Sequence, residues 1–367
     1  MSISLKERDR RYSAIRKYMQ KDELDSLLVV GRDGYMTRGN IRYITGYGVV
    51  TGEQYCIFPP EGDPVFITGN GPIMGRLQKA DWGLDFRVTS NPGEQIIKEL
   101  SRFDKGNKIG LVGIQDISVP TYLMVKERFG DRITDAIGIF RQLRLVKSAE
   151  EIEKMKVSAQ IADTALNALR DIIKPGVSGY EIYSTIKKTI FEMGCEYSFE
   201  LISSEAANVN LYYPTKDRLQ NNGLLVLEIS PAFEGYFAQL PVTLPVGDYP
   251  SHVHKMIPVW KQAFQAALEI LRPGTQVSDI YRVINDIIND NGYHAPWRPG
   301  HAIGLDLIDF WSVTDSNTTI LEPGMALALH PNVLLEPVVE GKGIGMGYTF
   351  LITDTGYERL SKIEIVD

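Results

Sequence analysis

The sequence predicts an α/β domain at the N-terminus and, after it, an α+β domain with an internal duplication of pseudo-twofold symmetry. Three observations lead to this prediction: helical and strand-like segments alternate at the start, a long capped helix begins near residue 148, and one residue pattern then occurs twice. A chain of 367 residues also suits two domains better than one. We place the first domain at residues 1–145 and the second at residues 146–367.

The first domain is expected to alternate between helices and strands. Helices are expected at 8–21, 92–100 and 120–129, and short apolar strands at 26–30, 55–58, 65–68 and 108–112. Glycine and proline flank several of these strands, as they do where a chain turns. Alternation of this kind indicates layers of helices packed on a sheet.

A long amphipathic helix is expected to open the second domain. Ser148 and Glu151 have the spacing of a capping box, in which each side chain bonds the backbone N–H group of the other residue. Apolar residues then recur at steps of three and four: Ile152, Met155, Ala159, Ala162, Leu166, Leu169 and Ile173. This period predicts one continuous apolar stripe, and Pro175 and Gly176 end the helix.

The second domain contains one pattern twice: a helix, a Pro-Gly stop, a second helix with an Ile-Tyr pair, and a closing glycine. The first copy has Pro175, Gly176, Ile182, Tyr183 and Gly194, and the second has Pro273, Gly274, Ile280, Tyr281 and Gly292. Each copy leads into strand-like sequence, at 223–229 and at 325–329. Because both copies keep the same offsets, we expect two similar halves that share one sheet, with the ligand site where they meet.

The composition is that of a globular protein, with 44% hydrophobic and 23% charged residues. A net charge of -7 and the lack of any Lys/Arg run argue against a nucleic-acid partner. No apolar run approaches the length of a membrane span, and the charged N-terminus lacks a signal-peptide core, so we expect a cytoplasmic protein without a membrane partner. Cys56 and Cys195 are too few for a disulfide framework and are expected to be buried thiols.

Several segments resemble landmarks of the creatinase, prolidase and aminopeptidase P family. They are RLVKSAEEIEKM at 144–155, YYPTKDR at 212–218, LVLEISPAFEGYFAQLPVTLPVG at 225–247, PGHAIGLDLID at 299–309, LEPGMALALHPN at 321–332 and GIGMGYTFLITDTGYERL at 343–360. With the α/β domain that precedes them, the resemblance covers essentially the whole chain. It implies a pita-bread fold for the second domain and a homodimer.

The resemblance also implies where two divalent metal ions would bind, and the residues there are changed. The family holds these ions with two Asp, one His and two Glu. The matching positions here carry Glu228, Gln239, His301, His330 and Gly347. Roughly three negative charges are therefore missing, and each uncompensated charge in a buried site costs several kcal/mol. We expect no metal pair to bind, and we expect no cofactor.

Creatinase works without metal, but its catalytic residues are not matched either. Its histidine falls closest to Tyr212, and its two glutamates fall on Pro241 and Gly347. The creatinase reaction itself is therefore not expected.

The remaining polar residues define a candidate site. The expected catalytic residues are His301, Glu228 and His330, and the expected substrate-binding residues are Gln239, Tyr212, Tyr213, Arg298 and Tyr348. Imidazoles and a carboxyl group with a raised pKa suit general acid–base catalysis. We therefore expect a metal-independent hydrolase or lyase that acts on a small polar substrate, at a C–N bond, in a creatinase-like cleft.

Two alternatives stay open. Glu228, His301 and His330 are a two-His, one-carboxylate set of the kind that binds a single transition-metal ion. In the second alternative, the second domain is a binding module without catalytic activity. A metal-dependent Xaa-Pro peptidase is not expected.

Glycines at 341, 343, 345 and 347 form a regular pattern near the last matched position. No strand and helix flank them in the order that a dinucleotide loop requires. We expect a flexible or strongly twisted hairpin near the candidate site.

Overall fold

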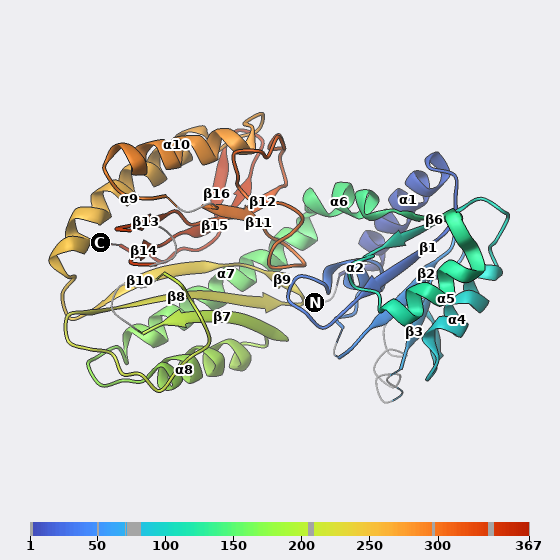
Figure 1. Cartoon of the computed structure of the whole chain (residues 1–367), viewed down its shortest axis with the longest axis horizontal. Helices are drawn as coiled ribbons and strands as arrows, with labels where there is room; N and C mark the ends of the chain where they lie inside the picture. Colours follow the sequence, from blue (N-terminus) through green and yellow to red (C-terminus); the bar gives the residue numbers. More distant parts are fainter. Residues whose placement is uncertain are drawn as a thin grey trace. The chain divides into compact units, whose positions relative to one another are not determined.

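The computed structural model describes residues 3–49, 51–69, 71, 82–204, 209–295, 298–336 and 341–366. The chain divides into two compact units, Met1–Leu145 and Val146–Asp367, called here the N-terminal unit and the C-terminal unit. The element order of both is drawn in Figure 1. In the part of the chain described, no helix is long and apolar enough to cross a membrane.

The N-terminal unit is built on a six-stranded sheet of order β4-β3-β2-β1-β5-β6. Its strands are β1 (Leu24–Gly31), β2 (Gln54–Phe58), β3 (Val65–Thr68), β4 (Asp85–Val88), β5 (Lys108–Val112) and β6 (Ile133–Asp135). Its helices are α1 (Leu5–Lys21), α2 (Gly39–Thr45), α4 (Pro92–Ser101), α5 (Val119–Phe129) and α6 (Ile137–Leu145), with a short 3-10 turn at Gly130–Arg132. The predicted α/β alternation is confirmed, and β1 lies in the middle of the sheet.

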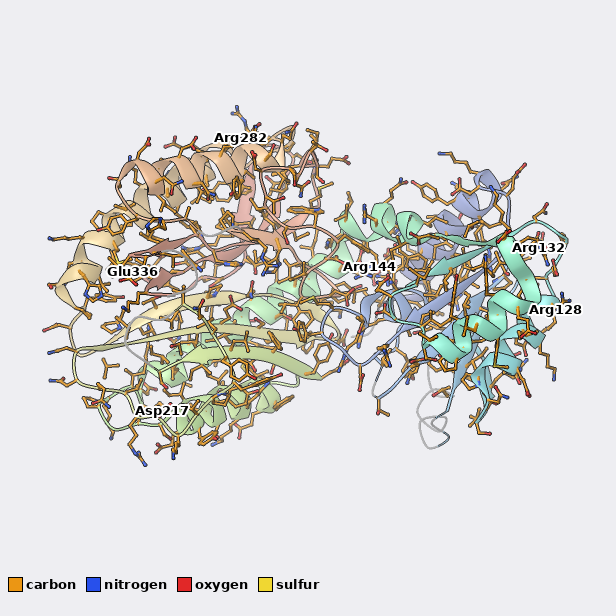
Figure 2. The ribbon with its side chains drawn as sticks, in the orientation of Figure 1. Arg128, Arg132, Arg144, Asp217, Arg282 and Glu336 are labelled. Carbon is orange, nitrogen blue, oxygen red and sulfur yellow. The ribbon has the colours of Figure 1, made fainter. Side chains whose placement is uncertain are left out.

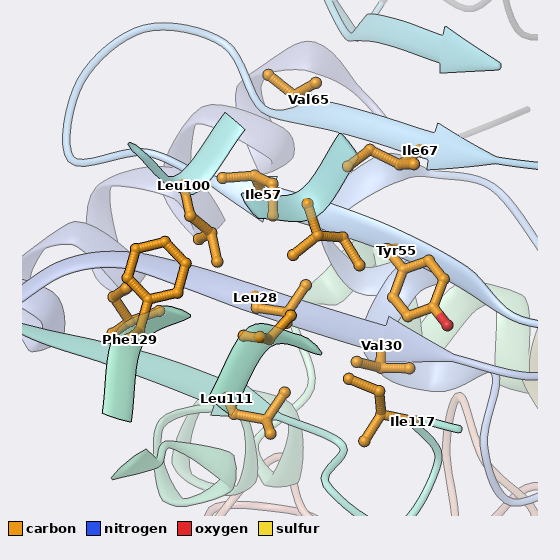
Figure 3. Close-up of a cluster of buried hydrophobic side chains, with 13 residues drawn as sticks. Leu28, Val30, Tyr55, Ile57, Val65, Ile67, Leu100, Leu111, Ile117 and Phe129 are labelled. Atoms are coloured by element: carbon orange, nitrogen blue, oxygen red, sulfur yellow. The ribbon is translucent and has the colours of Figure 1, made fainter. Parts of the chain in front are cut away.

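One face of this sheet carries the apolar core that Figure 3 shows. Leu28 and Val30 of β1 are two residues apart and therefore point to the same face. Ile57 and Leu111 of the neighbouring strands join them, and Phe129 of α5 packs on top. Every residue of β1 is buried, which explains why its run Leu27–Val30 is apolar without alternation.

The C-terminal unit consists of two helix pairs and three small sheets. The helices are α7 (Ala149–Arg170), α8 (Gly179–Glu192), α9 (Ser251–Ile270) and α10 (Val277–Asp290). The strands are β7 (Tyr197–Ser203), β8 (Gly223–Phe233), β9 (Tyr236–Phe237), β10 (Leu240–Val246), β11 (Gly300–Ala302), β12 (Ala326–Leu329), β13 (Asn332–Leu334), β14 (Gly343–Gly345), β15 (Tyr348–Ile352) and β16 (Tyr357–Arg359).

The sheets lie between the pair α7 and α8 and the pair α9 and α10 (Figure 1). The first sheet has the order β10-β8-β7 with β9 on β8, the second has the order β11-β12-β15-β16, and β13 pairs with β14. Side chains fill the space between the helix pairs, whereas Asp217 and Arg282 point outward (Figure 2). Each half thus contributes a helix pair and strands, as the duplication predicts, but the strands form separate sheets and not the one shared sheet that was expected.

The repeated glycines occupy equivalent backbone conformations. Gly176 and Gly194 have φ of 90° and 89°, and Gly274 and Gly292 have φ of 89° and 77°. Side chains disfavour this left-handed region, so glycine suits these positions. Gly194 and Gly292 follow the ends of α8 and α10, whereas Gly176 and Gly274 lie in the turns after α7 and α9, which already end at Arg170 and Ile270, before the predicted stops. The helices that follow the stops, α8 and α10, are both 14 residues long.

The capping box at the start of α7 is present as predicted. Ser148 Oγ accepts from the backbone N–H of Glu151 at 3.4 Å, and Glu151 Oε2 accepts from that of Ser148 at 2.8 Å. The other carboxylate oxygen of Glu151 accepts from the Tyr236 hydroxyl at 3.0 Å. The cap therefore also ties α7 to the first sheet of its own repeat.

A set of hydrogen bonds, called here the seam, joins β10 of the first repeat to residues 345–349 of the second. Gly347 N donates to Pro241 O at 3.0 Å. Thr243 Oγ1 donates to Gly345 O at 2.9 Å and accepts from Gly345 N at 3.0 Å. The seam therefore links the sheet that contains β10 to β14 and to the residues just before β15.

The sequence did not predict α2, β4, β6 or α6. The strands β4 and β6 have four and three residues, and their burial is partial. Edge strands this short carry no clear period-2 pattern, so local sequence gives little signal for them.

We expect Gly274→Ala to destabilise the protein by about 1–2 kcal/mol, because an alanine at φ of 89° strains the backbone. The added Cβ meets no atom within 4 Å, so packing does not contribute. Gly356→Ala is the matched control, since its Cβ also meets nothing and its φ is not left-handed. Urea unfolding of the full chain measures both, and equal effects would contradict the conformational explanation.

Candidate active site

The seam connects three of the five positions at which the family holds metal: Glu228, Gly347 and His330. Glu228 of β8 pairs with Pro241 of β10, and Pro241 O accepts from Gly347 N. Gly347 in turn lies against His330, because a Cβ built on Gly347 would fall 2.5 Å from the His330 Cα. Glu228 and His330, one from each repeat, are therefore connected across the seam through Pro241 and Gly347.

His301 completes the site from β11. His301 pairs with Ala328 of β12, and Ala328 lies two residues before His330 in the sequence. The two imidazole rings lie 5.4 Å apart, centroid to centroid, at an interplanar angle of 68°. His301 is 2% exposed and His330 is 6% exposed, so both rings are removed from bulk water.

Gln239 links the carboxylate of Glu228 to the second repeat. Its Nε2 donates to Glu228 Oε2 at 3.1 Å. Its backbone N donates to Thr349 Oγ1 at 2.8 Å, and Thr349 Oγ1 donates to its carbonyl at 3.0 Å. Thr349 was not among the predicted site residues, because a threonine within a strand gives no signal of such a role.

Burial raises the pKa of Glu228 to about 6, although the positive charge of Arg298 and the hydrogen bond from Gln239 both act to lower it. Burial lowers the pKa of Arg298, and the negative charge of Glu228 acts against this. Arg298 Nη1 also donates to Ser312 Oγ at 3.5 Å. The carboxyl group of Glu228 thus exchanges protons near neutral pH, beside a cation.

Burial lowers the pKa of His301 to about 4, with a smaller contribution from the charge of Arg298. The pKa of His330 is lowered well below its usual range, first by burial and then by His301 and Arg298. Both imidazoles are therefore neutral at pH 7. His301 Nδ1 lies 3.0 Å from Ala302 O, and because a carbonyl only accepts, Nδ1 carries the proton and Nε2 is the acceptor.

Two buried atoms of the site have no hydrogen-bond partner within the described residues: Gln239 Oε1 and His330 Nε2. Leaving a buried polar group unsatisfied costs about 1–3 kcal/mol. Gln239 is 3% exposed, so its Oε1 is shielded from bulk solvent. Atoms of this kind at the meeting point of two repeats indicate a place where a ligand binds.

The structure does not bring the predicted tyrosines to this group. Tyr212 and Tyr213 are 69% and 56% exposed, and their rings contact each other with centroids 5.3 Å apart. The Tyr348 hydroxyl donates to Glu364 Oε2 at 3.4 Å and accepts from Ile365 N at 3.1 Å. The polar group of Tyr348 therefore bonds the C-terminal segment, and the candidate site consists of Glu228, Gln239, Arg298, His301 and His330.

The residues at the five positions do not fit a pair of divalent ions. Within the described ranges, no three His, Cys, Asp or Glu side chains are grouped so that they could hold a metal ion, which also removes support for the single-ion set. A Cβ at Gly347 would lie 2.0 Å from Leu329 O, so no side chain fits there without movement of the backbone. Gln239 turns its amide N–H, which is not a metal ligand, toward Glu228.

Two family models match the chain. The model described as metallopeptidase family M24 matches residues 153–354, and the one described as the creatinase/prolidase N-terminal domain matches residues 11–146. An uncharacterized peptidase of Staphylococcus epidermidis is 24% identical over 367 residues, which cover 95% of this chain and 98% of that protein. An uncharacterized peptidase of Staphylococcus aureus is 28% identical over 230 residues, or 61% of this chain and 64% of that protein.

Solved structures share the fold of both units. A prolidase from Pyrococcus horikoshii has a TM-score of 0.82 at 19% identity, with 97% of this chain and 100% of that chain covered. A Xaa-Pro dipeptidase from Bacillus anthracis has a TM-score of 0.82 at 19% identity, with 98% and 99% covered. At this level of identity the likeness is one of fold, and it confirms the predicted pita-bread architecture.

These comparisons correct the predicted function. The expectation of a metal-independent hydrolase or lyase that acts on a small polar, creatinase-like substrate is wrong, because the relatives are named as peptidases and the matching family is one of metallopeptidases. The predicted non-peptide substrate was inferred from the altered residues at the positions where the family binds metal. Such changes alter the charge at the reacting centre, whereas the shape that selects a substrate comes from the whole domain.

We expect Glu228→Gln to stabilise the protein relative to wild type by about 1–2 kcal/mol more at pH 8 than at pH 4. The pKa of Glu228 is raised from 4.5 to about 6 on folding, so its contribution to stability is complete below pH 4.5 and is lost as pH rises through 6. Urea unfolding at several pH values measures this. Glu192→Gln, at a side chain 67% exposed, is the control, and a pH-independent difference for Glu228→Gln would contradict the raised pKa.

Proposed function

This chain belongs to metallopeptidase family M24 and is a hydrolase of that family, and from this premise we propose that it cleaves the amide bond of short peptides. The observation that carries the proposal is the pair of buried, unpartnered atoms, Gln239 Oε1 and His330 Nε2, beside a carboxyl group that titrates near neutral pH. Membership of the family supports hydrolysis as the reaction, and the buried polar atoms of the candidate site support binding of a peptide.

The site offers complementary contacts to a short peptide. Gln239 Oε1 accepts a hydrogen bond, and a peptide carries N–H donors in its amide and ammonium groups. Arg298 provides a guanidinium group that pairs with the terminal carboxylate of a peptide. Free dipeptides, including the Xaa-Pro type named for one structural neighbour, are therefore the first substrates to test.

Proton transfer is assigned to Glu228. With a pKa of about 6, its carboxylate takes a proton from water at pH 7 while the water oxygen attacks the carbonyl carbon of the peptide. When the C–N bond breaks, the carboxyl group returns that proton to the leaving nitrogen. His301 orients the water by accepting a hydrogen bond at Nε2, and Gln239 holds the Glu228 carboxylate in place.

We expect the wild-type protein to release free amino acids from Xaa-Pro or Xaa-Ala dipeptides, and Glu228→Gln to lower kcat at least about 100-fold because the proton acceptor is removed. Glu192→Gln, on the exposed face of α8, is the matched control and should leave kcat unchanged. The assay runs in chelator-treated buffer and again with added Mn²⁺, so that the result is read under both conditions.

A second variant tests the carboxylate contact. Arg298→Met should raise KM about tenfold or more for free dipeptides and leave KM for C-terminally amidated dipeptides unchanged. Absence of hydrolysis in both buffers, or full turnover by Glu228→Gln, would contradict the proposed function. The homodimer and the cytoplasmic location stay predictions from the sequence.

A further inference from the structure

A fully buried ion pair lies next to the site in the C-terminal unit. Lys147 Nζ is 3.1 Å from Asp309 Oδ2, and both side chains are 1% exposed. Burying two charges costs several kcal/mol per ion before their attraction is counted, so such a pair is not explained by stability alone. The contacts around Lys147 and Asp309 show which segments the ion pair connects.

Lys147 is anchored on both sides by backbone structure. Its N–H donates to Gly324 O at 2.9 Å, and the next residue, Ser148, is the N-cap of α7. A Cβ at Gly324 would come within 3.3 Å of Lys147 O, so the two segments are in close contact. The backbone of Lys147, which carries the ammonium group, is therefore fixed in position.

Asp309 lies in the loop after β11, and the pair clamps this loop. Asp309 N donates to Ala302 O at 2.9 Å, and Ala302 N donates to Trp311 O at 3.0 Å. Between these contacts Phe310 has φ of 77°, a conformation that bulky side chains adopt only where the surroundings impose it. Gly304 packs against the pair, since its Cβ would lie 2.5 Å from Asp309 Oδ2.

The loop acts on His301 through one carbonyl group. Ala302 O accepts from Asp309 N at 2.9 Å, and it also lies 3.0 Å from His301 Nδ1. A carbonyl oxygen has two lone pairs, so it can accept both hydrogen bonds at once. The direction of this carbonyl decides which ring nitrogen of His301 carries the proton.

We propose that Lys147 and Asp309 are positioning residues that fix the Ala302 carbonyl and thereby hold His301 in the Nδ1–H tautomer, with Nε2 available as an acceptor. The ion pair fixes the loop after β11, the loop orients the Ala302 carbonyl, and this carbonyl orients the His301 ring. The use of His301 in catalysis rests on the proposed function, but the tautomer does not.

The tautomer is measured by two-bond ¹H–¹⁵N NMR on protein labelled with ¹⁵N-histidine. The chain has five histidines, and His301→Gln assigns the signal. We expect wild-type His301 to be protonated at Nδ1 at pH 7.5. In the double variant Lys147→Met/Asp309→Asn, which removes both charges together, we expect a mixture with the Nε2–H form.

The matched control is Lys154→Met, which breaks the 2.9 Å ion pair between Lys154 of α7 and Glu234. It should leave the His301 spectrum unchanged. Gly304→Ala is a second probe, because its Cβ pushes on the Asp309 carboxylate while both charges stay. It should shift His301 in the same direction as the double variant.

An Nε2–H tautomer in the wild type, or an unchanged His301 spectrum in both the double variant and Gly304→Ala, would overturn the proposal. If dipeptides are hydrolysed, the double variant should lower kcat about tenfold or more with KM changed less than about twofold, and Lys154→Met should change neither. Should no dipeptide be hydrolysed, the proposed function fails while the NMR result still decides the positioning role.

Discussion

The hydrogen bonds across the seam between the two repeats are the constraint on which the site depends. The bond from Gly347 N to Pro241 O joins the strand pair that carries Glu228 to the segment of the second repeat that packs against His330. Neither repeat contains both residues, so the site exists only once the repeats are joined. Gly347 is part of this arrangement, because the strands approach so closely there that a Cβ has no room. A glycine at the last metal position is thus a packing requirement of this chain.

Burial at the seam moves the ionisable groups toward their neutral forms. It raises the pKa of Glu228 and lowers the pKa values of His301 and His330. Arg298 is the cation that acts on all three of these groups. A carboxylate set built for two dications would need the opposite electrostatics, with several anions held close together. The changed residues and the changed pKa values therefore describe one consistent environment, suited to proton transfer.

Much of the fold follows from local sequence. The capping box of Ser148 and Glu151 is a property of residues three apart, and the glycines after Pro175 and Pro273 suit the left-handed backbone of the turn between two helices. These features need no tertiary information to be recognised. The short strands β4 and β6 escaped prediction because their pairing with longer strands, rather than their own composition, makes them strands.

The sequence by itself determined the two-domain organisation, the duplication and the residue types at the metal positions, since these depend on spacing along the chain. Only the tertiary structure decided which polar groups meet. The Tyr348 hydroxyl bonds Glu364 and not the residues of the candidate site. Lys147 forms an ion pair with Asp309, which lies 162 residues away in the sequence. The physical reason is that side-chain contacts depend on strand register and loop conformation between segments far apart in sequence, which no local pattern encodes.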